Sequence, residues 1–195
     1  MLRRFTLRND SVAIFPKRIL IATRNPGKFC EIQAILGDLP LELVFLGDFS
    51  GKFDFEEKGE TFEENAASKA RFFAKKIGLS TLGEDSGIIV SALQGEMGVK
   101  TRRWGKGESA TDQEWLEYFL HRMRKFPNRR SAEFVCAAAL CLAGSVFIFT
   151  GSCLGEITLE IEAPIIHGLP LSSVFRPEGS DRVYAALTPE EKGRI

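Results

Sequence analysis

The loop after the first apolar run of the chain carries residues that could bind phosphate. Residues 18–23 read as a short strand, Asn25-Pro26-Gly27 is a strong turn signal, and a helical pattern follows. A turn at a helix N-terminus exposes backbone N–H groups and the positive end of the helix dipole, and both attract anions. Lys28 adds a full charge, while Thr23 and Asn25 add hydrogen-bonding side chains. The apolar side of the expected helix consists of Phe29, Ile32, Ile35 and Leu36.

Two interpretations of this loop are open from its residues alone: a phosphate cradle, or a plain turn with a solvated lysine. It is not a Walker A loop, because the pattern G-x-x-x-x-G-K-[ST] is absent.

A pair of adjacent carboxylates, Glu84 and Asp85, is the second candidate. The surrounding sequence Gly83-Glu84-Asp85-Ser86-Gly87 predicts a turn that runs into a strand over residues 88–90. Mg²⁺ takes one or two carboxylates together with water and substrate phosphates, and such a turn could supply them. One carboxylate would hold the metal while its neighbour orients or deprotonates water. A solvated acidic turn is the alternative.

A third group of charged residues surrounds the best-marked helix. Thr61 and Glu64 form a T-x-x-E pattern, which predicts an N-cap at Thr61. Acidic residues in the first helical turn are favoured by the dipole alone, but Glu57 lies upstream and lacks that explanation. Lys69 shares a helix face with Asn65 and points either to phosphate or to solvent. The expected core stripe consists of Ala66, Ala70, Phe73 and Ile77, with Gly78 as the stop.

The remaining pattern predicts an α/β fold with a mixed sheet. Thr111 and Glu114 mark the start of a third helix, and residues 132–142 and 146–150 form a hairpin around Ala143-Gly144-Ser145, with residues 151–161 continuing the sheet. Residues 18–195 form a single domain. Residues 1–17, basic and without an apolar signal core, are expected to be a partly disordered extension.

Composition excludes several function classes. The chain has 26 basic and 26 acidic residues, which argues against a broad nucleic-acid-binding surface. It holds no apolar run near the roughly 20 residues that span a bilayer. The four cysteines form no close pair and the two histidines stand far apart, so a zinc site is not expected. Cys136 and Cys141 are interpreted as small core residues. Reduced thiols and a cytoplasmic location follow as the default.

Taken in order, the motifs resemble the inosine triphosphate pyrophosphatase family, which removes non-standard purine triphosphates such as ITP, dITP and XTP. The resemblance runs from about Arg18 to the last residue, and five motifs in the family order make chance agreement improbable. They are residues 22–28 (ATRNPGK), 57–66 (EKGETFEENA) with Lys69-Ala70, 84–87 (EDSG), 110–113 (ATDQ) and 187–192 (LTPEEK).

The resemblance implies a two-lobed α/β fold around a long mixed sheet, with the active site in a cleft between the lobes, and usually a homodimer. It implies Mg²⁺-dependent attack of water on a nucleoside triphosphate, which gives a monophosphate and pyrophosphate. Asp85, Glu84 and Lys69 would be catalytic, and Asp85 with Glu57 would hold the metal. Substrate contacts would come from Thr23, Asn25, Lys28, Lys69, Ser86, Arg103, Gly168 and Leu169.

The chain departs from the family pattern where the base is held. The family carries a Gly-Phe-Gly-Tyr-Asp-Pro-like segment, and here the matching stretch begins Gly168-Leu169-Pro170-Leu171-Ser172. Loss of a stacking ring costs about 1–3 kcal/mol per base in comparable sites. The family's Ser-His-Arg element is expected just beyond Ile195, so the domain is expected to be short at its C-terminus. A relaxed-specificity or weakly active nucleotide-binding relative is therefore the alternative.

Overall fold

The computed structural model describes residues 16–107 and 109–195, so the expected extension over residues 1–17 lies outside the described part except for its last two residues. Six strands in this part form one sheet in the order β2-β1-β3-β4-β5-β6. In this order, the first three strands pair in parallel. The pairings from β3 to β4, β4 to β5 and β5 to β6 are antiparallel, which confirms the mixed α/β fold. The strands are β1 (Arg18–Ile21), β2 (Glu42–Phe45), β3 (Ser80–Val90), β4 (Ser131–Leu142), β5 (Ser145–Ile157) and β6 (Phe175–Pro177).

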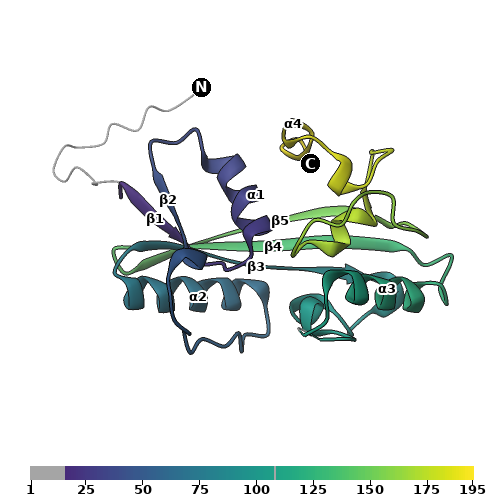
Figure 1. The fold of residues 1–195 in the computed structure, drawn as a ribbon, viewed down its shortest axis with the longest axis horizontal. Coiled ribbons are helices and arrows are strands. Elements are labelled where there is room, and N and C mark those ends of the chain that lie inside the picture. Colours follow the sequence, from purple (N-terminus) through teal and green to yellow (C-terminus); the bar gives the residue numbers. More distant parts are fainter. Residues whose placement is uncertain (1–15, 108) are drawn as a thin grey trace, which may run out of the picture.

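Helices cover both faces of the sheet (Figure 1). Helices α2 (Phe62–Ile77) and α3 (Asp112–Met123) lie on one face, whereas α1 (Pro26–Leu36), α4 (Pro189–Lys192) and the C-terminal segments lie on the other. Because β1 lies between β2 and β3, with α1 on one face and α2 on the opposite face, the chain changes face beside β1. The short 3₁₀ turns are η1 (Leu46–Asp48), η2 (Ser91–Leu93), η3 (Gly98–Arg103), η4 (Pro170–Ser173) and η5 (Tyr184–Ala186).

Helix α2 forms as its sequence predicts. The Thr61 hydroxyl accepts a hydrogen bond from the Glu64 N–H at 3.1 Å, and Gly78 ends the helix at a φ of +78°, a left-handed conformation that favours glycine. The expected stripe is buried at Ala66, Ala70 and Phe73. The two alanines let the helix pack closely on Gly83 of β3.

Helix α1 also forms where expected, but its apolar stripe is not a core stripe. Every residue of α1, all of them described, is at least partly exposed, and Ile35 is 76% exposed. The stripe lines open surfaces: Phe29 packs against Phe45 of β2 at 4.7 Å between ring centroids, while Ile32 and Ile35 border a large cleft. Spacing predicted the helix correctly but could not show that the described part of the chain leaves its apolar side partly exposed.

The turn expected at Gly83–Gly87 is wrong, because β3 runs unbroken from Ser80 to Val90. It pairs with β4 from Thr81 opposite Cys141 to Val90 opposite Ala132. The two glycines serve close packing instead of a turn. A Cβ on Gly83 would lie 2.4 Å from the Ala66 carbonyl oxygen, and one on Gly87 would lie 2.4 Å from the Gly98 carbonyl oxygen.

The expected hairpin is confirmed. Ala143 and Gly144 join β4 to β5 with φ angles of +48° and +84°, as a tight two-residue hairpin turn requires. The sheet continues past residue 150 as predicted, although β5 ends at Ile157 rather than at Ile161. A second core lies at the far end of the hairpin, where Trp115 and Phe119 of α3 pack near Phe175.

Candidate active site

A cleft of about 980 Å³ opens between α1 and the C-terminal segments, above β3, β4 and β5. It lies outside the carboxyl end of β1, where the chain changes from one face of the sheet to the other. Ligands of open α/β sheets commonly bind at such a point. Seven of the predicted site residues line this cleft: Thr23, Asn25, Lys28, Glu84, Ser86, Gly168 and Leu169.

An ion pair forms the centre of the α1 side. The Lys28 Nζ donates to Glu84 Oε2 at 2.8 Å and to Ser86 Oγ at 3.0 Å. Burial alone would lower the pKa of Lys28, but the charge of Glu84 raises it above its ordinary value. Burial likewise opposes ionisation of Glu84, yet Lys28 keeps the pKa of that carboxyl below its usual range. Both groups are therefore charged at neutral pH.

The loop before Lys28 differs from the open anion site that the sequence predicted. The Asn25 side-chain oxygen accepts from the N–H groups of Gly27 at 2.9 Å and Lys28 at 3.3 Å, and Pro26 has no N–H. The Thr23 hydroxyl in turn accepts from the Asn25 N–H at 3.1 Å. Since these donors are engaged, phosphate binding at this end would rely on side chains, chiefly Lys28.

The α2 side of β3 holds Asp85, which is 6% exposed. The buried amide of Asn65 donates to Asp85 Oδ2 at 2.9 Å, and its oxygen accepts from the Gly59 N–H at 2.8 Å. Burial, and then the negative charge of Glu57, raise the pKa of Asp85 to about 6. A carboxylate with such a pKa can accept a proton near neutral pH.

Lys69 and Glu57 complete this side. The Lys69 Nζ pairs with Glu57 and also donates to the Glu84 carbonyl oxygen at 2.7 Å. Arg103 lies 3.8 Å from the other oxygen of Glu57. Periodicity left open whether Lys69 points toward a ligand site or toward solvent. In the structure Lys69 points toward Glu57 and Glu84, and not toward solvent.

Glu84 and Asp85 lie on opposite faces of β3, which corrects the expectation that one turn presents both. Successive side chains alternate across a strand, so Glu84 and Ser86 face α1 while Asp85 faces α2. Lys28 from the α1 side and Lys69 from the α2 side both contact Glu84, one at its carboxylate and the other at its carbonyl oxygen, beside the open edge of β3. Pairing of β1 with β3 ends at Leu82, and β3 continues beyond it toward Val90.

The base-side segment packs against the loop before α1. The Asn25 Nδ2 donates to the Gly168 carbonyl oxygen at 2.9 Å, and Leu169 lies beside Gly27. Leu171 and Ser172 are buried in the wall of the cleft. Four aromatic residues also line the cleft: Phe134 and Tyr184 are partly exposed, whereas Trp115 and Phe175 are buried.

Known proteins are similar to this chain over most of its length. The model of the Ham1 family matches residues 19–195. The chain belongs to the Ham1 family. It is 35% identical to a dITP/XTP pyrophosphatase of Halalkalibacterium halodurans over 92% of each chain, and 43% identical to one of Geobacter sulfurreducens over 72% of this chain and 71% of the relative. A HAM1 protein structure from Coxiella burnetii superposes with a TM-score of 0.74 at 35% identity, over 91% of this chain and 90% of the other. The resemblance predicted from the motifs is confirmed.

Three polar residues of this Ham1 chain were not predicted as site residues. Asn65 bridges Asp85 and the Gly59 turn, and Asp112 accepts from the Gly168 N–H at 2.7 Å. Both lie in motifs quoted above for the family resemblance, residues 57–66 and 110–113, and these motifs were the signal that could have identified them. Cys136 borders the cleft instead of filling the core as expected, with its Sγ 3.8 Å from Glu84. Burial and the charge of Glu84 raise the pKa of this thiol to about 12.

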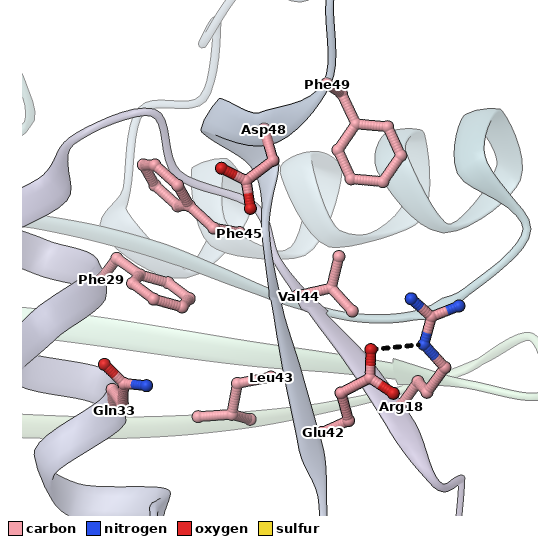
Figure 2. A pocket seen from close by; sticks show the side chains of 9 residues that line it. All are labelled: Arg18, Phe29, Gln33, Glu42, Leu43, Val44, Phe45, Asp48 and Phe49. Atoms are coloured by element: carbon pink, nitrogen blue, oxygen red, sulfur yellow. Dashed lines mark hydrogen bonds and ion pairs between the residues drawn. The ribbon is translucent and has the colours of Figure 1, made fainter.

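A second groove of about 610 Å³ lies at the outer edge of β2, away from these residues (Figure 2). Phenylalanine rings line one end, and Arg18 pairs with Glu42 at 2.9 Å at the other. The groove is lined by one cation, Arg18, and by two carboxylates, Glu42 and Asp48, so it is less suited to a triphosphate than the cleft. In the part of the Ham1 chain that the structure describes, no helix is long and apolar enough to cross a membrane.

Proposed function

We propose that this Ham1 protein hydrolyses non-standard purine nucleoside triphosphates (ITP, dITP and XTP) to the monophosphate and pyrophosphate, and so removes them from the nucleotide pool. Relatives named dITP/XTP pyrophosphatase match most of the chain. The observation that carries the proposal is the convergence at the open edge of β3. Two lysines, Lys28 and Lys69, reach this edge beside Asp85, a carboxylate with a raised pKa.

Each residue has a chemical task in this proposal. Lys28 and Lys69 offset the charge of the triphosphate, and Ser86 and Thr23 add hydrogen bonds. Asp85 accepts the proton of the attacking water, whose oxygen bonds to the α-phosphorus as the bond to the pyrophosphate oxygen breaks. Asn65 holds Asp85 in place for this step. Glu84 keeps Lys28 oriented, and Arg103 lies beside Glu57.

The donor set fits Mg²⁺. Glu57 and Asp85 are close enough for the charge of Glu57 to raise the pKa of Asp85, and a cation between them would relieve that repulsion. Among the described residues no group of three or more His, Cys, Asp or Glu side chains forms a metal site by itself. Phosphates and water would have to complete the shell, as they do around Mg²⁺. When bound, the ion would stabilise the negative charge that develops on pyrophosphate.

A substrate panel tests the proposal. The protein would be incubated with ITP, dITP, XTP, ATP and GTP, with Mg²⁺ or with EDTA, while pyrophosphate and orthophosphate are measured separately. We expect pyrophosphate from the non-standard purines, with ATP and GTP much slower. Orthophosphate as the main product would refute the proposal.

Relaxed specificity or weak activity is the second candidate. Leu169 borders the cleft where the family pattern has an aromatic residue. On this alternative, ITP and GTP would be hydrolysed at similar rates, or nucleotides would bind without turnover even at high protein and Mg²⁺ concentration. The same panel, with binding measured by calorimetry, separates the two candidates.

A homodimer is the assembly that we propose, and the support for it lies on β5. Phe147, Ile148, Phe149 and Leu154 on this strand are each about half exposed or more. Strand β6 pairs with β5 only from Gly155 onward, so the edge before it is open to a second copy. Light scattering after gel filtration should give twice the mass of one chain. A Phe149→Lys variant should give a monomer, whereas a monomeric wild type would contradict the proposal.

A further inference from the structure

Both backbone polar groups of Gly168 are hydrogen-bonded to side chains. Its N–H donates to Asp112 Oδ2 at 2.7 Å, and its carbonyl oxygen accepts from Asn25 Nδ2 at 2.9 Å. Gly168 has a φ of +78°, and a Cβ there would lie 2.3 Å from the Asn25 nitrogen. The backbone can therefore approach Asn25 this closely only because residue 168 is glycine.

Asp112 is supplied by a rigid part of the molecule. It is the first residue of α3, which is anchored by buried Trp115 and Phe119 and by the capping box of Thr111 and Glu114. The Asp112 side chain is 13% exposed, and its Oδ2 also lies 3.2 Å from the His167 Nδ1. The carboxylate is thus a fixed acceptor for the loop that bears Gly168.

The orientation of Asn25 follows from these contacts. Because the Gly168 carbonyl can only accept, the Asn25 nitrogen must face it and the Asn25 oxygen must face the α1 N–H groups. That oxygen is the cap of the helix turn that bears Lys28. Since α1 has no fully buried side chain to locate it, this polar connection contributes strongly to the position of its first turn.

We infer that Asp112 is a positioning residue for triphosphate binding: it holds the backbone of Gly168 through its N–H, and the carbonyl of the same residue orients Asn25 and the α1 turn that carries Lys28. The inference rests on the proposed function, because it assumes that Lys28 contacts the triphosphate. Asp112 does not itself touch phosphate; it acts through two hydrogen bonds.

A merely structural role for Asp112 is the competing explanation, since an acidic residue in the first turn stabilises any helix. Glu114 provides the matched control. It lies in the same turn of α3 and bonds the Thr111 N–H at 2.9 Å, but it has no contact with Gly168. Asp112→Ala removes the acceptor for the Gly168 N–H, Asp112→Asn keeps an oxygen there, and Glu114→Ala weakens only the helix end.

Steady-state kinetics with ITP give the first test. We expect Asp112→Ala to raise KM about tenfold while kcat changes much less, the size expected for one lost hydrogen bond to a charged group. The KM values for XTP and GTP should rise by the same factor, because the effect acts on the phosphate end. Asp112→Asn should stay within about threefold of wild type. An unchanged KM in Asp112→Ala, an equal rise in Glu114→Ala, or no rescue by Asp112→Asn would overturn the inference.

Amide hydrogen exchange gives a test that needs no turnover. In the full-length protein, the Gly168 amide should exchange at least tenfold faster in Asp112→Ala than in Glu114→Ala or wild type. If wild type releases no pyrophosphate from any triphosphate, the proposed function fails whatever the exchange data show. If wild type is active but Asp112→Ala leaves both the exchange rate and KM unchanged, only the positioning role fails.

Discussion

Helices α1 and α2 each bring one lysine to β3, but different forces hold them. Helix α2 buries Ala66, Ala70 and Phe73 and packs so closely that β3 needs a glycine beneath it. Helix α1 has no fully buried residue and is fixed at its first turn by Asn25 and by the pair of Lys28 with Glu84. The two sides of the site are therefore stabilised by different interactions. The side of the site that carries Asp85 is built into the core, whereas the side that carries Lys28 depends on polar contacts.

The largest expected effect comes from the core-held side. Asp85→Asn should lower kcat for ITP by about 10³-fold, because it removes the proton acceptor while keeping the shape and the bond from Asn65. The measurement is pyrophosphate release under saturating ITP and Mg²⁺. Asp48→Asn, an exposed carboxylate in η1, is the control and should match wild type. Equal activity in Asp85→Asn would remove Asp85 from the mechanism.

The polar side is probed by taking its ion pair apart. Lys28→Met should lower kcat/KM about 10²-fold and also destabilise the protein by about 3 kcal/mol, since it leaves Glu84 buried without its cation. The double variant Lys28→Met/Glu84→Gln should regain most of the stability but not the activity. Urea unfolding beside the kinetic assay checks both. A double variant no more stable than the single one would show that the pair does not hold α1.

How much of this could be read from the sequence depended on whether a signal was local. The T-x-x-E patterns and Gly78 predicted α2 and α3 correctly, because capping is decided by neighbours in the chain. The sequence around Glu84 and Asp85 predicted a turn, whereas the structure has strand β3 there. Its glycines are explained by Ala66 and Gly98, contacts that only the fold creates.

For the candidate site, too, the sequence could predict only what local signals determine. Charged residues such as Lys28, Lys69 and Asp85 could be nominated by type and motif, and the structure places them around one strand edge. Glu84 and Asp85 face opposite sides because side chains alternate along a strand. A turn was expected at these residues, so this alternation was not predicted. Asn65 and Asp112 lie in motifs quoted for the family resemblance, but their roles were not predicted because their partners are distant in sequence: Asp85 for one and Gly168 for the other.

Packing beneath α2 predicts the next effect in size. Gly83→Ala would place a methyl group 2.4 Å from the Ala66 carbonyl oxygen, a backbone atom that cannot move freely. We expect a loss of about 1–3 kcal/mol in the free energy of unfolding, as for other overpacked cores. Gly151→Ala on β5 has open space around its Cβ and should change stability little, so the two variants are compared by urea unfolding. A tolerated Gly83→Ala would mean that α2 is not closely packed.

Burial of Asp85 on the α2 side should make the free energy of unfolding depend on pH. The pKa of Asp85 rises from 3.8 to about 6 on folding, so the folded state binds the proton more tightly than the unfolded state. Wild type therefore loses stability as pH rises from about 4 through 6, by about 2 kcal/mol. In EDTA, Asp85→Asn should be more stable than wild type at pH 8, and the difference should vanish near pH 4. A difference independent of pH would contradict this origin.

The smallest expected effect belongs to α1. Ile35 is 76% exposed although it stands on the helix's apolar stripe. Ile35→Ser should change the free energy of unfolding by no more than about 0.5 kcal/mol, as exposed substitutions do. Phe73→Ser on α2, at a buried position of the equivalent stripe, should cost several times more. If Ile35→Ser were as damaging at low protein concentration, α1 would be core-held after all. If its cost appeared only where light scattering detects a dimer, a second copy would cover the stripe, and the contrast between the helices would hold for the single chain alone.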